Sequence, residues 1–248
     1  MMTSLTLILP AFNEETRLPR TFNLLKSAID SGVFAQCDLQ EILVVNDGSQ
    51  DQTVQVASAA KTDLPEIRVI LVQPNQGKGN AIHTGLREAR GDWCLIADAD
   101  SATPWDQFKK LWQAVEQSRE PAQVTIGSRD MPESEIRTSQ SWAREHMGKT
   151  FNLIVRLITG LPFRDTQCGF KLIHRGSIQP FISNLKVKRF AWDVEFLMFA
   201  RAHKLNVIEV PVAWEHQEES RVNPVKDSLE MLLRVVQMKF RILLIKWK

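Results

Sequence analysis

The sequence predicts an α/β fold in which a mostly parallel β-sheet is flanked by helices. Short apolar runs alternate with longer segments of helical periodicity through the first half of the chain. Polar clusters rich in Asn, Asp and Gly follow four of these runs. Of the 248 residues, 44% are hydrophobic and 24% are charged, which excludes a disordered chain and suffices for a buried core. Strand-helix alternation of this kind implies right-handed βαβ units.

The first half predicts five strands, each a short run of aliphatic residues, joined by helices whose apolar residues recur three or four positions apart. In chain order they are strand 5–9, helix 14–30, strand 41–46, helix 50–61, strand 67–72, helix 77–89, strand 92–97, helix 105–117 and strand 124–128.

The second half is less regular and predicts helix 139–159, strand 169–174, helix 192–203, strand 207–212 and a long helix from about residue 225. Neither an internal repeat nor a linker rich in Pro, Ser or Gly interrupts the chain. We therefore expect one catalytic domain over residues 1–220 and a basic, apolar C-terminal helix over residues 221–248.

Cysteine spacing and the first residues indicate a cytoplasmic protein. Cys37, Cys94 and Cys168 are far apart and form no CxxC pair, which supports neither a disulfide framework nor a structural zinc site. The uncharged run over residues 1–13 is interrupted by Pro10 and has no basic flank, so we expect neither a membrane span nor a signal peptide.

Charge is concentrated in the tail, where residues 221–248 carry seven basic and two acidic side chains in a chain of net charge +2. A nucleic-acid groove across the whole fold is therefore not expected. The charges also forbid a membrane-spanning tail helix. The tail helix has two interpretations: it packs on the catalytic domain or a second subunit, or it lies on a membrane surface. The oligomeric state stays open.

Four polar clusters follow predicted strands at the carboxyl edge of the sheet, where open parallel sheets bind ligands. They are Asn13-Glu14-Glu15, Asn46-Asp47-Gly48-Ser49, Asn75-Gln76-Gly77-Lys78-Gly79 and Asp98-Ala99-Asp100. Each cluster alone also fits a helix cap. Together they predict one ligand crevice.

The absence of two common nucleotide-binding motifs limits the kinds of ligand expected in this crevice. The glycines at 77 and 79 are followed by Ile82 where a dinucleotide fingerprint has its third glycine, and no GxxxxGK[ST] loop occurs. Asp98 and Asp100 fit Mg²⁺ or Mn²⁺ bridging a nucleotide diphosphate, because these cations bind carboxylates together with substrate phosphates. An aspartyl nucleophile of phosphatase type is a minor alternative.

An ordered set of motifs resembles the family 2 inverting glycosyltransferases of the GT-A fold. It consists of Leu9-Pro-Ala-Phe-Asn-Glu-Glu15, Val45-Asn-Asp-Gly-Ser49, Asn75-Gln-Gly-Lys-Gly79, Asp98-Ala-Asp100, Gly127-Ser-Arg129 and Asp165-Thr-Gln-Cys-Gly-Phe-Lys171. Within that family the chain is most similar to the dolichyl-phosphate β-glucosyltransferase group, with polyprenyl-phosphate mannosyltransferases next. One departure is Glu219-Ser220-Arg221, where the family often has Gly-Ser-Lys.

The resemblance implies a role for each matching residue. For nucleotide binding these are Pro10, Ala11, Asn13, Glu14, Asp47, Lys78 and Asp98; for the metal, Asp98 and Asp100; for catalysis, Asp100, Arg129 and Asp165; for the acceptor phosphate, Arg129, Arg144 and Lys171. Two of these residues, and also Glu195, keep a second interpretation. Arg144 also fits a solvated helix surface, Asp165 a cap or a pair with Arg164, and Glu195 either site orientation or a structural salt bridge.

The implied reaction is transfer of glucose from UDP-glucose to a polyprenyl or dolichyl phosphate with inversion, aided by a divalent cation, on the cytoplasmic face of a membrane. Three alternatives remain at this point: a mannosyltransferase using GDP-mannose, a sugar-nucleotide nucleotidyltransferase, and a non-catalytic membrane adaptor that uses the basic tail.

Overall fold

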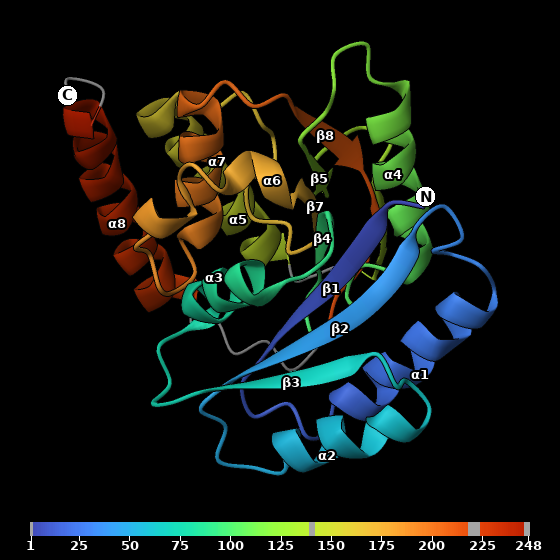
Figure 1. Ribbon diagram of the computed structural model, residues 1–248. Coiled ribbons are helices and arrows are strands. Elements are labelled where there is room, and N and C mark those ends of the chain that lie inside the picture. Colours follow the sequence, from blue (N-terminus) through green and yellow to red (C-terminus); the bar gives the residue numbers. More distant parts are fainter. Residues whose placement is uncertain (1, 139–141, 218–223, 246–248) are drawn as a thin grey trace.

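The computed structural model describes residues 2–138, 142–217 and 224–245 (Figure 1). In that part of the chain the main sheet has seven strands in the order β3-β2-β1-β4-β7-β5-β8. Their bounds are β1 (Ser4–Ala11), β2 (Asp38–Asp47), β3 (Ile67–Val72), β4 (Trp93–Ile96), β5 (Val124–Ser128), β7 (Lys171–His174) and β8 (Val207–Pro211).

Strand β7 is the exception in a sheet whose other pairings are parallel, because it runs antiparallel to both β4 and β5. Lys171, its first residue, pairs with Ile96 of β4 and Ile126 of β5. Those partners lie at or near the carboxyl ends of their strands. The reversal therefore brings the segment that precedes β7 to the edge where ligands bind in a parallel sheet. The predicted α/β class with a mostly parallel sheet is confirmed.

Helices cover both faces of the sheet and form one apolar cluster on each. On one face lie α1 (Leu18–Asp30), α2 (Thr53–Ala59) and α4 (Phe108–Gln117). On the other lie α3 (Lys78–Glu88), α5 (Trp142–Thr159), α6 (Arg175–Ile178), α7 (Trp192–Ala202) and α8 (Pro224–Ile245). Short 3₁₀ turns complete the set: η1 (Ala60–Thr62), η2 (Trp105–Gln107) and η3 (Ile182–Asn184).

Several boundaries differ from the sequence prediction. Helix α1 begins at Leu18 rather than residue 14, because the backbone N–H groups of Glu14 and Glu15 donate to Thr53 and Asp51 instead of entering a helix. A small parallel ribbon, β6 (Glu135–Thr138) with β9 (Ala213–Glu215), was not predicted. Strands of three or four residues are too short to show an alternating pattern.

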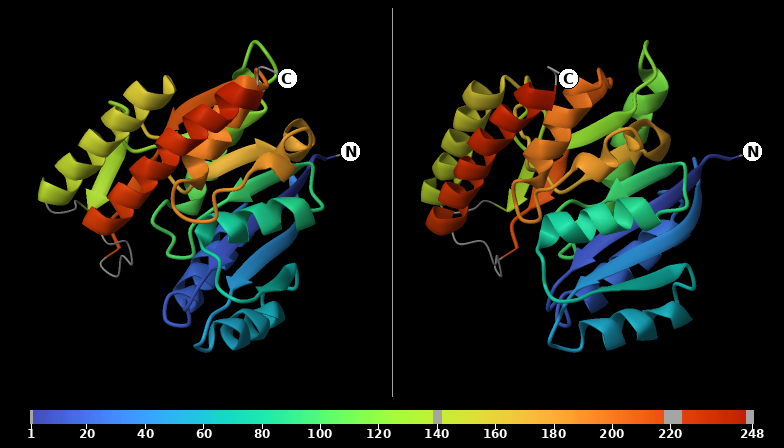
Figure 2. Two further views of the ribbon diagram at one scale, coloured as in Figure 1. Left: turned by 90° about the vertical axis from the view of Figure 1, so that its left-hand side faces the viewer. Right: turned by 60° about the vertical axis from the view of Figure 1, so that its left-hand side comes forward.

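The C-terminal helix α8 packs against α5 and α7 (Figure 2). Met231, Val235 and Met238 are buried in the same apolar cluster as α3 and α7. Arg241 forms an ion pair with the fully buried Glu195 of α7. The structure thus agrees with the packing interpretation of this helix and with a salt bridge for Glu195.

The opposite side of α8 is also apolar but is exposed, at Leu233, Val236 and Phe240. None of the helices in the described ranges is long and apolar enough to cross a bilayer.

The buried face of α8 can be tested against its exposed face. We expect Met238→Ala to lower the free energy of unfolding by about 2–4 kcal/mol, because the substitution leaves a cavity in the core. Leu233→Ala, on the exposed side of the same helix, should change it by less than about 0.5 kcal/mol. Urea unfolding of both variants measures the difference; equal losses would contradict the packing of α8.

Candidate functional site

The second and third strand-end clusters are joined through one carboxylate. Asp47 is 2% exposed, and its oxygens accept hydrogen bonds from the backbone N–H groups of Gly77 (2.6 Å) and Gln76 (3.0 Å) and from the Asn75 amide (2.8 Å). The segment that Asp47 holds leads directly into Lys78, the first residue of α3. Asp47 therefore shapes the crevice from within, and its expected contact with a base or ribose stays a prediction.

The first cluster is built into the same wall. Asn13 adopts a left-handed backbone conformation (φ 53°), its N–H donates to Ser49 Oγ (2.8 Å), and its side-chain oxygen accepts from the N–H of Gln50 (2.8 Å). Glu14 is largely buried and forms an ion pair of 2.5 Å with Arg17. Strand β1 ends just before this segment in two further predicted residues, the half-buried Pro10 and the buried Ala11.

The fourth cluster carries the charged centre of the crevice. Lys78 Nζ lies 2.5 Å from Asp98 Oδ1, while Asp100 accepts a hydrogen bond of 3.0 Å from the N–H of Ala102. Asp98 also lies against Gly169, where an added Cβ would come within 2.2 Å of a carboxylate oxygen. Any larger residue at this position would have to displace the Asp98 carboxylate.

The two carboxylates differ in their affinity for protons. Burial alone disfavours the ionised form of Asp98, but the Lys78 ammonium outweighs it and lowers the pKa of that carboxyl. Burial and then the neighbouring charge of Asp98 raise the pKa of Asp100. Two hard oxygen ligands that repel each other suit a divalent cation, and Mg²⁺ characteristically binds one or two carboxylates plus substrate phosphates. No group of three or more His, Cys, Asp or Glu side chains that could hold a metal ion occurs among the described residues.

Arg129, at the end of β5, is clamped by Asp165 from the segment before β7. Arg129 Nε lies 2.6 Å from Asp165 Oδ2, and Nη2 lies 3.0 Å from Oδ1, which makes a bidentate pair. Asp165 has no exposed surface. Although burial opposes ionisation, the Arg129 guanidinium holds the pKa of Asp165 at about 2. Arg129 also lies over the ring of Trp214, 5.6 Å from its centroid.

Lys171 lies deeper than the sequence predicts for a residue that contacts an acceptor phosphate. Its side chain has no exposed surface, and Nζ lies 2.6 Å from Asp193 Oδ1. The ammonium also donates to the backbone carbonyls of Thr166 and Cys168 and lies 5.5 Å from the ring centre of Trp192. Lys171 therefore organises the loop before β7 and does not present its charge to solvent.

Three contributors to this arrangement were not among the predicted site residues. Glu209 of β8 accepts the backbone N–H groups of Asp165 (2.8 Å) and Arg164 (3.0 Å), and so fixes the loop that carries Asp165. Asp193 balances Lys171, and Gly169 makes room for Asp98. Two signals in the sequence could have found them: the glutamate at position 209 inside an apolar strand, and the place of Gly169 within the motif 165–171. The pairing of Lys171 with Asp193 left no local pattern.

Two predictions fall where the structure gives no side-chain description. Arg144 lies in the first turn of α5, but its side chain is outside the described residues. The departure at Glu219-Ser220-Arg221 is outside them as well.

Comparison with known proteins adds independent information. The family described as Glycosyl transferase family 2 matches residues 6–180. A dolichyl-phosphate beta-glucosyltransferase of Drosophila melanogaster is 35% identical, with 98% of this chain aligned to 77% of that protein. The human dolichyl-phosphate beta-glucosyltransferase is 34% identical over the same shares.

Among solved structures, the fold is similar to that of glucosyl-3-phosphoglycerate synthase from Mycobacterium tuberculosis, crystallised with Mn²⁺, uridine diphosphate and phosphoglyceric acid. The TM-score is 0.68, and the match covers 95% of this chain and 77% of that one. At 17% identity the likeness concerns the fold alone.

The Arg129–Asp165 pair predicts a specific acid sensitivity. A carboxyl whose pKa is lowered by folding stabilises the protein above its unfolded pKa of about 3.9, and this contribution of about 2–3 kcal/mol is lost as the pH falls toward 2. We expect Asp165→Asn to remove that part of the pH dependence and to cost about 3–5 kcal/mol at neutral pH, because it leaves Arg129 without its buried partner. Urea unfolding between pH 2 and 7 measures both effects.

A matched control is Asp30→Asn, which breaks an exposed pair with Lys26. Such a pair contributes less than about 1 kcal/mol. If the two variants lost equal stability, the Arg129–Asp165 clamp would have no special structural role.

Proposed function

Because the chain belongs to glycosyltransferase family 2 and has the GT-A fold, we propose that this glycosyltransferase moves glucose from UDP-glucose to a polyprenyl or dolichyl phosphate with inversion at the anomeric carbon. The observation that carries the proposal is the match of 98% of the chain, at 32–35% identity, to proteins named dolichyl-phosphate beta-glucosyltransferase. The paired charges at the carboxyl edge of the sheet supply what such a transfer needs.

A phosphate acceptor removes the need for a carboxylate base. The second pKa of a phosphate monoester is about 6, so the group is largely dianionic at neutral pH. One of its oxygens attacks the anomeric carbon and forms the new C–O bond. The bond from that carbon to the UDP oxygen breaks, and UDP leaves with the electron pair. The protein has to align the phosphate and stabilise the departing diphosphate.

Each predicted residue has a part in this scheme. Arg129, oriented by Asp165, binds the acceptor phosphate together with Arg144, because guanidinium groups contact phosphate oxygens in pairs. The burial and low pKa of Asp165 favour a positioning role over that of a base. Lys171 acts at a distance, because its buried ammonium favours the ionised form of Asp98.

Pro10, Ala11, Asn13, Glu14 and Asp47 form the nucleoside side of the crevice in this proposal, with Lys78 next to the diphosphate. Asp98 and Asp100 would hold Mg²⁺ or Mn²⁺. The cation supplies charge stabilisation for the leaving diphosphate when bound. Lys78 already neutralises one carboxylate of the pair.

A donor screen tests the proposed reaction. The purified protein, a polyprenyl phosphate in detergent and either UDP-glucose or GDP-mannose are incubated, and the released nucleotide diphosphate and the lipid product are identified. We expect UDP release and a β-linked glucosyl phosphate lipid. Turnover of GDP-mannose alone would overturn the proposal in favour of a mannosyltransferase. Release of pyrophosphate in a parallel incubation with UTP and glucose 1-phosphate would overturn it in favour of a nucleotidyltransferase.

Metal dependence should reside in the acidic pair. We expect Asp100→Asn to lower kcat/KM by roughly a hundredfold or more, because a lost anionic ligand removes several kcal/mol of charge stabilisation. The exposed Asp63 provides the matched control, Asp63→Asn, which should keep wild-type activity. Steady-state assays across a Mn²⁺ titration, with a chelator arm, make the comparison. Full activity of the Asp100 variant in chelator would contradict the assignment.

Substitutions at Arg129 and Arg144 should impair use of the lipid acceptor without weakening the binding of UDP-glucose. Arg144→Ala should raise the KM for the lipid phosphate roughly tenfold to a hundredfold, the loss of about 1.5–3 kcal/mol from one charge-assisted contact, with UDP-glucose affinity unchanged. At position 129 we use Arg129→Lys, because alanine would leave the buried carboxylate of Asp165 without a positively charged partner. Separate measurements of UDP-glucose affinity and acceptor kinetics distinguish the roles; equal losses in both would refute them.

A membrane surface is the proposed location of the reaction. Helices α5 and α8 lie side by side (Figure 2) and expose large apolar side chains, among them Leu157 (75% exposed) and Phe240 (65% exposed). Further members of this apolar face are Leu153, Leu233 and Val236. Basic residues on the same helices, Arg156 and Lys239, favour an anionic lipid surface. Peripheral attachment on the cytoplasmic face stays a prediction.

Point substitutions test this attachment better than truncation, because α8 also contributes buried side chains. We expect Leu157→Ser/Phe240→Ser to reduce co-sedimentation with anionic vesicles several-fold, while transfer in detergent is retained. The control Leu24→Ser/Leu71→Ser removes exposed leucines from α1 and β3, away from this face. Vesicle binding that is equal in the two double variants would exclude the α5–α8 face as the membrane contact.

A further inference from the structure

A pocket lined by basic and apolar side chains lies beside α8, between that helix and the segment 186–191 that leads into α7. Its volume is about 440 Å³, within the range of small-ligand sites. Gln76, in the segment before α3, forms part of its wall, but the residues assigned above to nucleotide, metal and acceptor do not line it. Neither the proposed reaction nor the family comparison uses this pocket.

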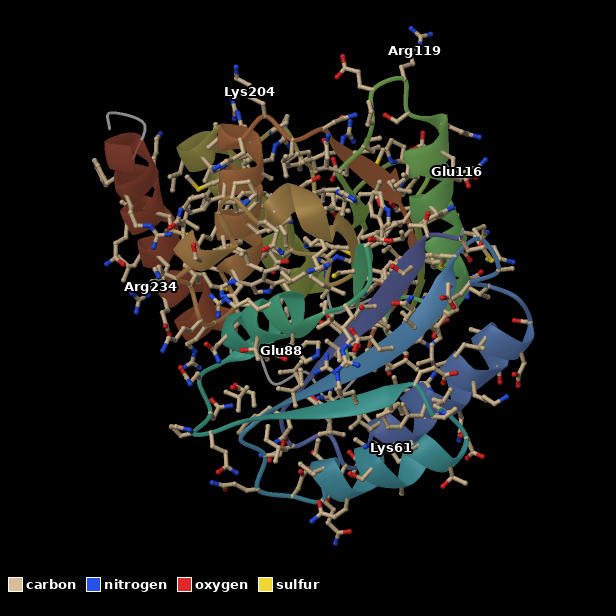
Figure 3. The ribbon with its side chains drawn as sticks, in the orientation of Figure 1. Lys61, Glu88, Glu116, Arg119, Lys204 and Arg234 are labelled. Atoms are coloured by element: carbon tan, nitrogen blue, oxygen red, sulfur yellow. The ribbon has the colours of Figure 1, made fainter. Side chains whose placement is uncertain are left out.

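The pocket is strongly basic. Five cationic side chains line it, together with a single carboxylate, that of Glu230; the cations are Lys186, Lys188, Arg189, Arg234 and Arg241. They come from two separate segments of the chain, which converge on one cavity. Figure 3 shows Arg234 on the outer side of α8.

Most of this charge has neutral hydrogen-bond partners. Lys188 Nζ donates to Gln76 Oε1 (2.7 Å), and Arg234 Nη1 donates to Gln237 Oε1 (3.3 Å). Lys186 Nζ donates to a backbone carbonyl, that of Ser183 (2.9 Å). Because amide and carbonyl oxygens carry no net charge, these contacts orient the cations without neutralising them.

One buried carboxylate fixes the shape of the cavity. Glu195 accepts the backbone N–H groups of Lys186 (2.9 and 3.0 Å) and Val187 (2.8 Å) and also forms the ion pair with Arg241. Glu195 therefore links the segment 186–191 to α8. Arg241 Nε is buried and has no hydrogen-bond acceptor within the described part of the chain. The floor is apolar, formed by side chains of Val187, Met231 and Met238.

From these observations we infer a second phosphate-binding site, separate from the catalytic crevice, for a small phosphate-bearing molecule with an apolar part. Guanidinium and ammonium groups that converge on one cavity match the several oxygens of a phosphate, and among the described contacts only Arg241 is paired with a carboxylate, that of Glu195. The apolar floor suits the first carbons attached to it. The same helix presents Leu233, Val236 and Phe240 to solvent, so the headgroup of a membrane phospholipid fits this chemistry, as does a soluble phosphate compound.

The test removes two pocket charges without removing a buried contact. The variant is Lys186→Gln/Arg234→Gln, and the control Lys61→Gln/Arg119→Gln removes the same charge from exposed positions that Figure 3 shows far from α8. Three probes are used: inorganic phosphate, soluble dihexanoyl phosphatidic acid, and phosphatidylcholine vesicles containing phosphatidic acid. Calorimetry gives the affinities for the first two, and co-sedimentation gives that for the vesicles.

We expect the pocket variant to bind soluble phosphatidic acid about tenfold or more weakly than the wild type, and the control variant to bind it normally. An equal loss for vesicles identifies a membrane lipid as the source; a loss confined to the soluble probes identifies a free phosphate compound. Equal binding of every probe by the pocket and control variants would overturn the site. Glucosyl transfer in detergent should be unchanged in both variants. Absence of UDP release by the wild-type protein would therefore count against the proposed function and not against this second site.

Discussion

The bidentate pair between Arg129 and Asp165 is the contact on which the crevice depends. It joins the end of β5 to the segment that precedes β7, and Glu209 of β8 holds the same segment from the other side. Because β7 runs against its neighbours, this segment reaches the carboxyl edge of the sheet and not the opposite one. A parallel strand in that place would have carried Asp165, Gly169 and Lys171 away from the acidic pair.

The crevice holds its charges in alternation. Lys78 faces Asp98, Arg129 faces Asp165, and Lys171 faces Asp193, with Asp100 beside the first pair. Buried ions cost free energy unless they are paired with good geometry. Pairing offsets part of this cost in a partly dehydrated site, where electrostatic interactions with a diphosphate are stronger than in water. Burial and then the neighbouring charge of Asp98 raise the pKa of Asp100.

Helix α8 has three sides that lie in different environments. One side is buried against α5 and α7, the opposite side is apolar and exposed, and a third side supplies cations to the pocket beside segment 186–191. This division explains why its sequence shows a broad apolar surface with basic residues on more than one side. A helix that only packed on the domain would not need the exposed apolar residues, and a helix that only lay on a bilayer would not need the buried ones.

Local pattern determined much of this protein. Short aliphatic runs specify the strands of the sheet, because branched side chains that face apolar neighbours on both sides leave a pattern a few residues long. The strand-end clusters, including Asp98 and Asp100, can also be recognised in the sequence, because each directly follows one of these short aliphatic runs. The tertiary structure alone decided the direction of β7, the partners of Lys171 and Asp47, and the burial of one side of α8. Those features depend on contacts between segments distant in the chain, such as Lys171 with Asp193 and Arg241 with Glu195, and a pair of opposite charges far apart in sequence has no periodicity to reveal it.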